Sequence, residues 1–134
     1  MLPYVVGVVL SLGVACFARL VGFDRDRAFY PTVLIVIAST YPLFAAMGAS
    51  TQVLVLESLV MLGFVIAAVV GFRTSVWVVV VAMAGHGLLD ATHSHVIANA
   101  GVPVWWPGFC LTYDVGAAAG LAWLGSRQPE GVSR

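Results

Sequence analysis

The chain has 134 residues, of which 61% are hydrophobic and 9% charged, and its mean hydropathy is +1.03. Soluble domains are about 45–50% apolar with about 25% charged residues, so this composition excludes a soluble globular protein and predicts one embedded in lipid. The formal net charge is zero and every basic residue is an arginine, which excludes a basic nucleic-acid-binding surface and leaves the lipid bilayer as the expected partner.

Two hydrophobic segments fill the first third of the sequence. Residues 3–23 are long enough to cross a hydrocarbon core, which needs roughly 20 apolar residues, and a short run of alternating charges follows them. Residues 28–48 form the second predicted span. Pro42 lies inside it and removes a backbone donor, so we expect a kink there, with Ser39 or Thr40 available to satisfy a freed carbonyl.

Three further spans and a polar tail complete the chain. The spans are predicted at residues 52–72, 75–96 and 108–124, and the tail at residues 125–134. The fourth span opens with β-branched residues, which favour a strand in water. In lipid an isolated strand leaves its backbone groups unpaired, so a helix is predicted. Trp105 and Trp106 precede the last span and are typical of an interfacial anchor.

The arginines predict how the spans are oriented. Five spans place the first connection, the third connection and the C-terminus on one side of the membrane, and Arg19 lies near enough to snorkel to that side. The other arginines, all on that side, are Arg25, Arg27, Arg73, Arg127 and Arg134. By the positive-inside rule the N-terminus is outside and the C-terminus cytoplasmic. A four-span alternative would scatter the arginines. We therefore predict an all-α membrane protein, a single five-transmembrane-helix bundle over residues 1–134.

Polar residues of the fourth span gather on one face. At 100° per residue, His86, Asp90 and His93 lie at roughly 0°, 40° and −20°, whereas His95 falls on the opposite side. A charged group that faces hydrocarbon costs several kcal/mol. The stripe is therefore expected to face protein or a wet cavity, and His95 the membrane interface.

Other spans carry polar residues to the same depth. Counting roughly 1.5 Å per residue from the outer span ends, the most polar residue of each of four spans lies about 8–10 Å deep. These residues are Tyr41, Glu57, Asp90 and Asp114. Buried ionisable groups in membranes are costly and usually mark a site. Tyr41 or Tyr113 taken singly is better explained by an interhelical hydrogen bond, but the ionisable residues together predict a functional pocket.

Three kinds of chemistry fit this pocket. The first is a transition-metal site for Zn, Fe or Cu, because imidazole and carboxylate groups are ligands of these ions. Its candidate ligands are His86, Asp90, His93, Glu57 and Asp114. The second is acid–base catalysis by His86 and Asp90 on a lipophilic small molecule, within a pocket formed by Glu57, Tyr41, Tyr113 and Asp114. The third is a relay for protons or a metal ion, which would require an oligomer.

Two noncatalytic interpretations stay open at this point. The polar cluster would specify only helix packing if the chain were a membrane subunit or scaffold. Separately, Gly116 and Gly120 are four residues apart, a spacing that lets another helix approach closely. That face predicts contact either within the chain or in a homo-oligomer.

Several motifs together resemble a known family. They are DRDRAFY from Asp24 to Tyr30 with Pro31, then His86-Gly87, Asp90 and His93, and finally GVPVWWPGFCLTYD, which ends at Asp114. In these motifs the chain resembles a family of small bacterial integral membrane proteins defined by a domain of unknown function. The resemblance covers most of the chain and implies a multi-pass protein of the bacterial inner membrane. It implies no activity, cofactor or substrate.

Overall fold

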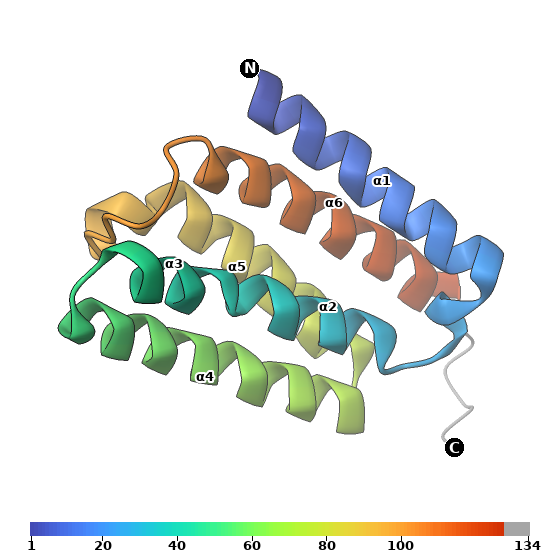
Figure 1. Ribbon diagram of the computed structural model, residues 1–134. Coiled ribbons are helices and arrows are strands. Elements are labelled where there is room, and N and C mark those ends of the chain that lie inside the picture. Colours follow the sequence, from blue (N-terminus) through green and yellow to red (C-terminus); the bar gives the residue numbers. More distant parts are fainter. Residues whose placement is uncertain (128–134) are drawn as a thin grey trace.

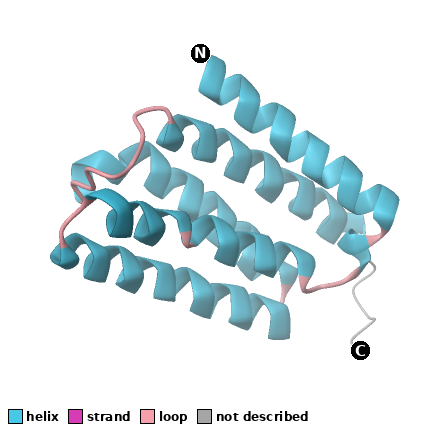
Figure 2. Cartoon of the chain, viewed as in Figure 1, coloured by secondary structure: helices cyan, strands magenta, loops and turns pink. Residues whose placement is uncertain are grey.

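The computed structural model describes residues 1–127, which form helices joined by short connections (Figures 1 and 2). The helices are α1 (Leu2–Val21), the short 3-10 helix η1 (Phe23–Arg25), α2 (Phe29–Ala38), α3 (Thr40–Gly48), α4 (Thr51–Arg73), α5 (Val76–Val96) and α6 (Trp106–Arg127). The all-α prediction is confirmed. Because α2 and α3 follow each other as one broken segment, five long segments result, and their ends lie within three residues of the predicted ones. Residues 125–127 of the predicted tail belong to α6, and residues 128–134 lie outside the described part.

Four of these segments are long and apolar enough to cross a membrane: α1, the α2–α3 segment, α4 and α5. The fifth, α6, is as long as its neighbours but less hydrophobic on average, since glycine and alanine take the place of larger apolar residues in it. Large hydrophobic side chains are exposed over the bundle, including Leu20, Val81 and Leu88. In water such exposure would be unfavourable, whereas lipid solvates it. The surface therefore fits a membrane protein.

Helix α5 occupies the middle of the bundle. Figure 1 shows α6 between α1 and α5, while α4 and the α2–α3 segment cover the other side of α5. Ser50 caps the start of α4 by accepting a hydrogen bond from the Val53 amide, and Ser75 caps α5 by accepting one from the Trp77 amide. These caps satisfy amides that a helix start leaves unpaired. Because α6 lies on one side of α5 and α4 with the α2–α3 segment on the other, the polar stripe of α5 faces helices on two sides.

The predicted kink in the second span is present. Helix α2 ends at Ala38 and α3 begins at Thr40, just before Pro42. The Ser39 hydroxyl donates to the Val36 carbonyl at 2.6 Å, and the Thr40 hydroxyl donates to the Ile37 carbonyl at 2.7 Å. These bonds satisfy carbonyls at the break, as Ser and Thr commonly do near a membrane proline. The break lies immediately before Tyr41.

The arginines of the described residues lie at one end of the bundle, and Arg134 is outside the described part. Arg27 donates to the Thr74 carbonyl at 3.3 Å, which joins the first connection to the third. The guanidinium groups of Arg19 and Arg127 lie 5.5 and 4.0 Å from the ring centre of Trp123 on α6. This arginine end lies on the right of Figure 1. The opposite end has the α3–α4 and α5–α6 connections, and we call it the outer end after the orientation that the arginines predict.

Small residues let α1 approach α6. A methyl group added at Gly7 would overlap the Thr112 hydroxyl and the Phe109 carbonyl, and one added at Gly116 would overlap Ser11. Lipid provides no hydrophobic drive for helix association, so such close contacts carry much of the packing energy. Gly116 thus packs within the chain, while a methyl group at Gly120 would meet open space. Oligomerisation through the Gly116/Gly120 face stays a prediction.

Replacing Gly7 tests this contact. Gly7→Leu should separate α1 from α6 and lower the free energy of unfolding by about 1–3 kcal/mol, the usual cost of overpacking. Thermal unfolding in detergent, followed by circular dichroism, measures the change. Gly13→Leu is the matched control, because nothing lies within 4 Å of a methyl group at Gly13 on the same helix. Equal melting temperatures for the two variants would contradict the packing described here.

Candidate functional site

The centre of the site is a contact between α5 and α6. His86 Nδ1 lies 2.7 Å from Asp114 Oδ2, within hydrogen-bond distance. Gly87, the next residue on α5, lies against α6, where an added methyl group would come 3.3 Å from the Asp114 Cβ and 3.4 Å from the Leu111 carbonyl oxygen. A larger residue would push the helices apart. Gly87 therefore sets the helix separation at which the imidazole reaches the carboxylate.

Asp90 lies one turn further along α5 and joins the second span to the same contact. Its Oδ1 accepts a hydrogen bond of 2.6 Å from the Tyr41 hydroxyl. Its Oδ2 lies 3.5 Å from His86 Nδ1. One imidazole nitrogen thus faces two carboxylates, one from its own helix and one from α6.

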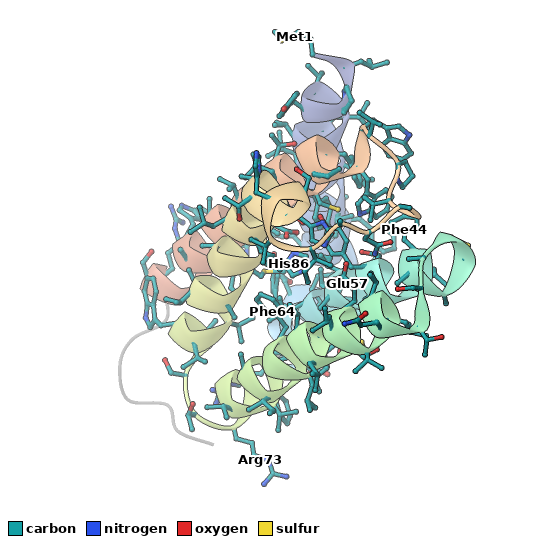
Figure 3. All side chains as sticks on the ribbon, turned by 90° about the vertical axis from the view of Figure 1, so that its left-hand side faces the viewer. Met1, Phe44, Glu57, Phe64, Arg73 and His86 are labelled. Carbon is teal, nitrogen blue, oxygen red and sulfur yellow. The ribbon has the colours of Figure 1, made fainter. Side chains whose placement is uncertain are left out.

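A second polar group lies beside the first. His93 Nε2 and the Asn99 amide both lie 2.9 Å from Glu57 Oε1, and the Asn99 amide also donates to the Tyr41 carbonyl at 3.2 Å. The Tyr41 ring stacks on His93, with the ring centres 3.9 Å apart and a 12° angle between planes. Tyr41 therefore connects the Glu57 group to the Asp90 group. Figure 3 shows Glu57 and His86 both within the interior of the bundle.

All five ionisable residues predicted for the pocket are buried. Asp114 is 0% exposed, Glu57 and His86 are 1% exposed, and Asp90 and His93 are 2% exposed. Each of the three carboxylates nevertheless has one buried oxygen without a hydrogen-bond partner among the described residues: Glu57 Oε2, Asp90 Oδ2 and Asp114 Oδ1. An unpaired buried oxygen costs about 1–3 kcal/mol or more. Each of these oxygens is therefore available to accept a further hydrogen bond or to coordinate a cation.

Three of the predicted metal ligands come together. His86, Asp90 and Asp114 each offer one donor atom, and these atoms lie within 4.8 Å of one another. His93 and Glu57 pair with each other instead. Tyr113 is buried in the apolar core, together with Tyr30, Leu34 and Met83. His95 is exposed, on the opposite side of α5 from the buried stripe.

Sequence reasoning missed three contributors to the site. Asn99 lies outside the predicted spans, yet its side-chain amide donates a hydrogen bond to Glu57 and so ties the α5–α6 connection to α4. Phe64 packs edge-on against His86 with ring centres 4.7 Å apart, and Figure 3 shows it on α4 toward the interior. Gly87 permits the helix approach. A lone Asn between two spans and a Gly beside the His were the available signals, but neither is specific.

A pocket of about 610 Å³ reaches the polar cluster from the outer end. Asp90 and His93 lie at its polar side, along with Ser94 and Asn99. Tyr4 of α1, Leu111 of α6 and the connection between α5 and α6 form its other walls. The volume is within the range of about 300–1,000 Å³ typical of small-molecule sites.

Comparison with known proteins adds no assignment. No family model matches the chain, and neither the curated proteins nor the solved structures include a match. The function must therefore be argued from the geometry of the site itself.

The Tyr41 hydroxyl provides a test of this geometry. Tyr41→Phe keeps the ring that stacks on His93 but leaves a second oxygen of Asp90 without a partner. We expect the free energy of unfolding in detergent to fall by about 1–2 kcal/mol. Tyr4→Phe, at a half-exposed tyrosine, is the control and should change it by less than about 0.5 kcal/mol. Equal effects of both substitutions would refute the Tyr41–Asp90 bond.

Proposed function

We propose that the chain is a multi-pass membrane protein that binds one divalent transition-metal ion between His86, Asp90 and Asp114. The observation that carries the proposal is the convergence of three buried donor atoms within 4.8 Å. One imidazole and two carboxylates suit Zn²⁺ or Fe²⁺, for which nitrogen and oxygen ligands are common. Fewer than four protein ligands leave a coordination position open, as in catalytic zinc sites.

Charge supports a divalent ion. Asp90 and Asp114 together bring two negative charges into a region with almost no solvent exposure, and Glu57 is already paired with His93. A buried charge has to be paired, coordinate a metal or be neutralised by a proton. His86 lies against both aspartates, but one imidazolium would balance only one of them. One divalent cation neutralises both aspartates and also provides a partner for Asp90 Oδ2 and Asp114 Oδ1.

A role in helix packing alone explains the cluster less well. Each charged residue in the hydrocarbon layer costs about 2.5–3.5 kcal/mol on insertion scales. An interhelical hydrogen bond returns on average only about 0.6 kcal/mol. Three acids, each with an oxygen that has no partner among the described residues, would therefore destabilise the bundle more than their hydrogen bonds stabilise it. A bound ion would compensate this cost, which supports the proposal.

The apolar core favours binding over transport. Leu34, Val79 and Met83 are completely or almost completely buried, and they belong to the apolar cluster of the bundle. An ion that continued past the site toward the arginine end would have to cross this cluster, whose polar groups are the hydroxyls of Tyr30 and Tyr113 and which contains no charged side chain. The site therefore opens toward the outer end and acts as a binding site, with His86 and Asp90 as the residues through which a catalytic role would operate.

The proposal includes a location. We place all five segments across the inner membrane of a bacterium, with the N-terminus outside and the C-terminus in the cytoplasm. The clustering of Arg19, Arg27 and Arg127 at one end supports this orientation through the positive-inside rule. The bacterial inner membrane rests on the family resemblance. The metal site then lies in the outer half of the bilayer.

Metal analysis of the purified full-length chain tests the function. Prepared without chelators, it should contain about one ion per chain or take up Zn²⁺ to that ratio. His86→Ala and Asp90→Asn should each weaken Zn²⁺ binding by about 100-fold or more, because a ligand is lost outright. His95→Ala is the matched control, on the same helix but exposed, and should bind like the wild type.

Competition with a chromophoric chelator gives the affinities, and circular dichroism shows that each variant is folded. Should a variant fail to fold, Asp114→Asn, which is nearly isosteric, replaces it. A wild-type protein that binds Zn²⁺ no more tightly than about 100 μM contradicts the proposal. So does full retention of metal in His86→Ala and Asp90→Asn.

A further inference from the structure

The pocket at the outer end opens between exposed residues of α5 and of the α5–α6 connection. Ala91 and Ser94 of α5 line it and are exposed, as is Val104 of the α5–α6 connection, which is 100% exposed. Helices α1 and α5 both pack on α6, so their outer ends leave a recess whose base is formed by Gly108 and Leu111. A molecule in the outer leaflet could therefore reach the recess sideways without crossing water.

The walls and the inner end of the pocket differ in character. Ile97, Val102, Pro103 and Leu111 make much of the wall apolar. The inner end carries Asp90 and His93, both at least nine-tenths buried, and Asp90 Oδ2 has no hydrogen-bond partner among the described residues. This gradient matches an amphiphile whose polar head lies deepest and whose hydrocarbon tail points toward the bilayer.

The charged residues around the pocket indicate the charge of the ligand's polar head. No arginine lines the pocket, and the arginines with described contacts between segments lie at the opposite end. With the metal bound, an anionic head would add a negative charge that no residue of the pocket balances, because the ion already neutralises Asp90 and Asp114. A cationic amine would compete with the metal for the same aspartates. When the metal neutralises Asp90 and Asp114, an uncharged head with an oxygen atom can be buried beside them without leaving any charge unpaired.

We propose that this pocket binds an amphiphile with an uncharged hydroxyl head, taken laterally from the outer leaflet with the hydroxyl next to Asp90. The proposal rests on the proposed metal site, because the bound ion is what leaves the inner end without net charge. The hydroxyl oxygen would then face the coordination position that the three protein ligands leave open. The ligand class is a lipophilic alcohol, and the pocket is the substrate site of the metal centre.

Photolabelling of the full-length, zinc-loaded chain in phosphatidylcholine nanodiscs tests the pocket. The probe is decanol that carries a diazirine, and mass spectrometry maps the labelled residues. We expect labelling to concentrate on residues 91–111 and to fall about tenfold with excess unlabelled decanol. Decanoate and decylamine at the same concentration should reduce it by less than about twofold.

Two tryptophan substitutions provide matched variants. Ala91→Trp fills the mouth of the pocket and should reduce labelling about tenfold while leaving the metal content unchanged. Ala84→Trp lies two turns earlier on nearly the same face of α5, is equally exposed and lies outside the pocket. It should label like the wild type.

The outcomes separate this inference from the metal proposal. Labelling spread evenly over the lipid-facing surface, or insensitive to Ala91→Trp, overturns the pocket even where the metal is bound. Stronger displacement by decylamine or decanoate than by decanol overturns the uncharged head group. Selective, alcohol-specific labelling of a chain that binds no Zn²⁺ supports the pocket and overturns the metal site alone.

Discussion

The contact between His86 and Asp114 is the constraint on which the rest of the structure depends. It joins two residues that are 28 positions apart in sequence, one on α5 and one on α6. It requires these helices to cross at Gly87, where no side chain holds them apart. Because hydrocarbon solvates apolar side chains as well as a protein interior does, the bundle cannot rely on the hydrophobic effect to choose its packing. Buried polar groups determine the helix packing instead, because any polar group that lacks a partner stays unpaired in a medium without water.

The same requirement explains the other features around the site. The break between α2 and α3 brings Tyr41 to Asp90, and Asn99 ties the α5–α6 connection to Glu57. These bonds hold the carboxylates but leave one oxygen of each without a partner among the described residues. Buried polar atoms in proteins are normally hydrogen-bonded. The three oxygens are therefore the basis of the proposed metal site.

Much of this arrangement follows from the sequence by simple physics. Hydropathy and length locate the helices within three residues, and helical periodicity separates the buried His86, Asp90 and His93 from the exposed His95. Counting depth correctly predicts that Tyr41, Glu57, Asp90 and Asp114 meet. Periodicity cannot tell which partners pair, because that depends on helix rotation and separation. Hence the five predicted ligands divide into a group of three and a separate Glu57–His93 pair, and Tyr113 lies in the apolar core. The role of Asn99 could not be predicted, because it depends on how the α5–α6 connection folds back over α3.

X-ray absorption at the zinc edge, on the full-length chain loaded with one Zn²⁺, tests the central claim most directly because it reads the ligands themselves. The account predicts a single imidazole nitrogen at about 2.0–2.1 Å, with the remaining ligands oxygens at about 2.0–2.2 Å. A second imidazole would show that His93 leaves Glu57 to join the ion. Sulfur at about 2.3 Å would assign the metal to a cysteine. Either result would contradict a site made by His86, Asp90 and Asp114.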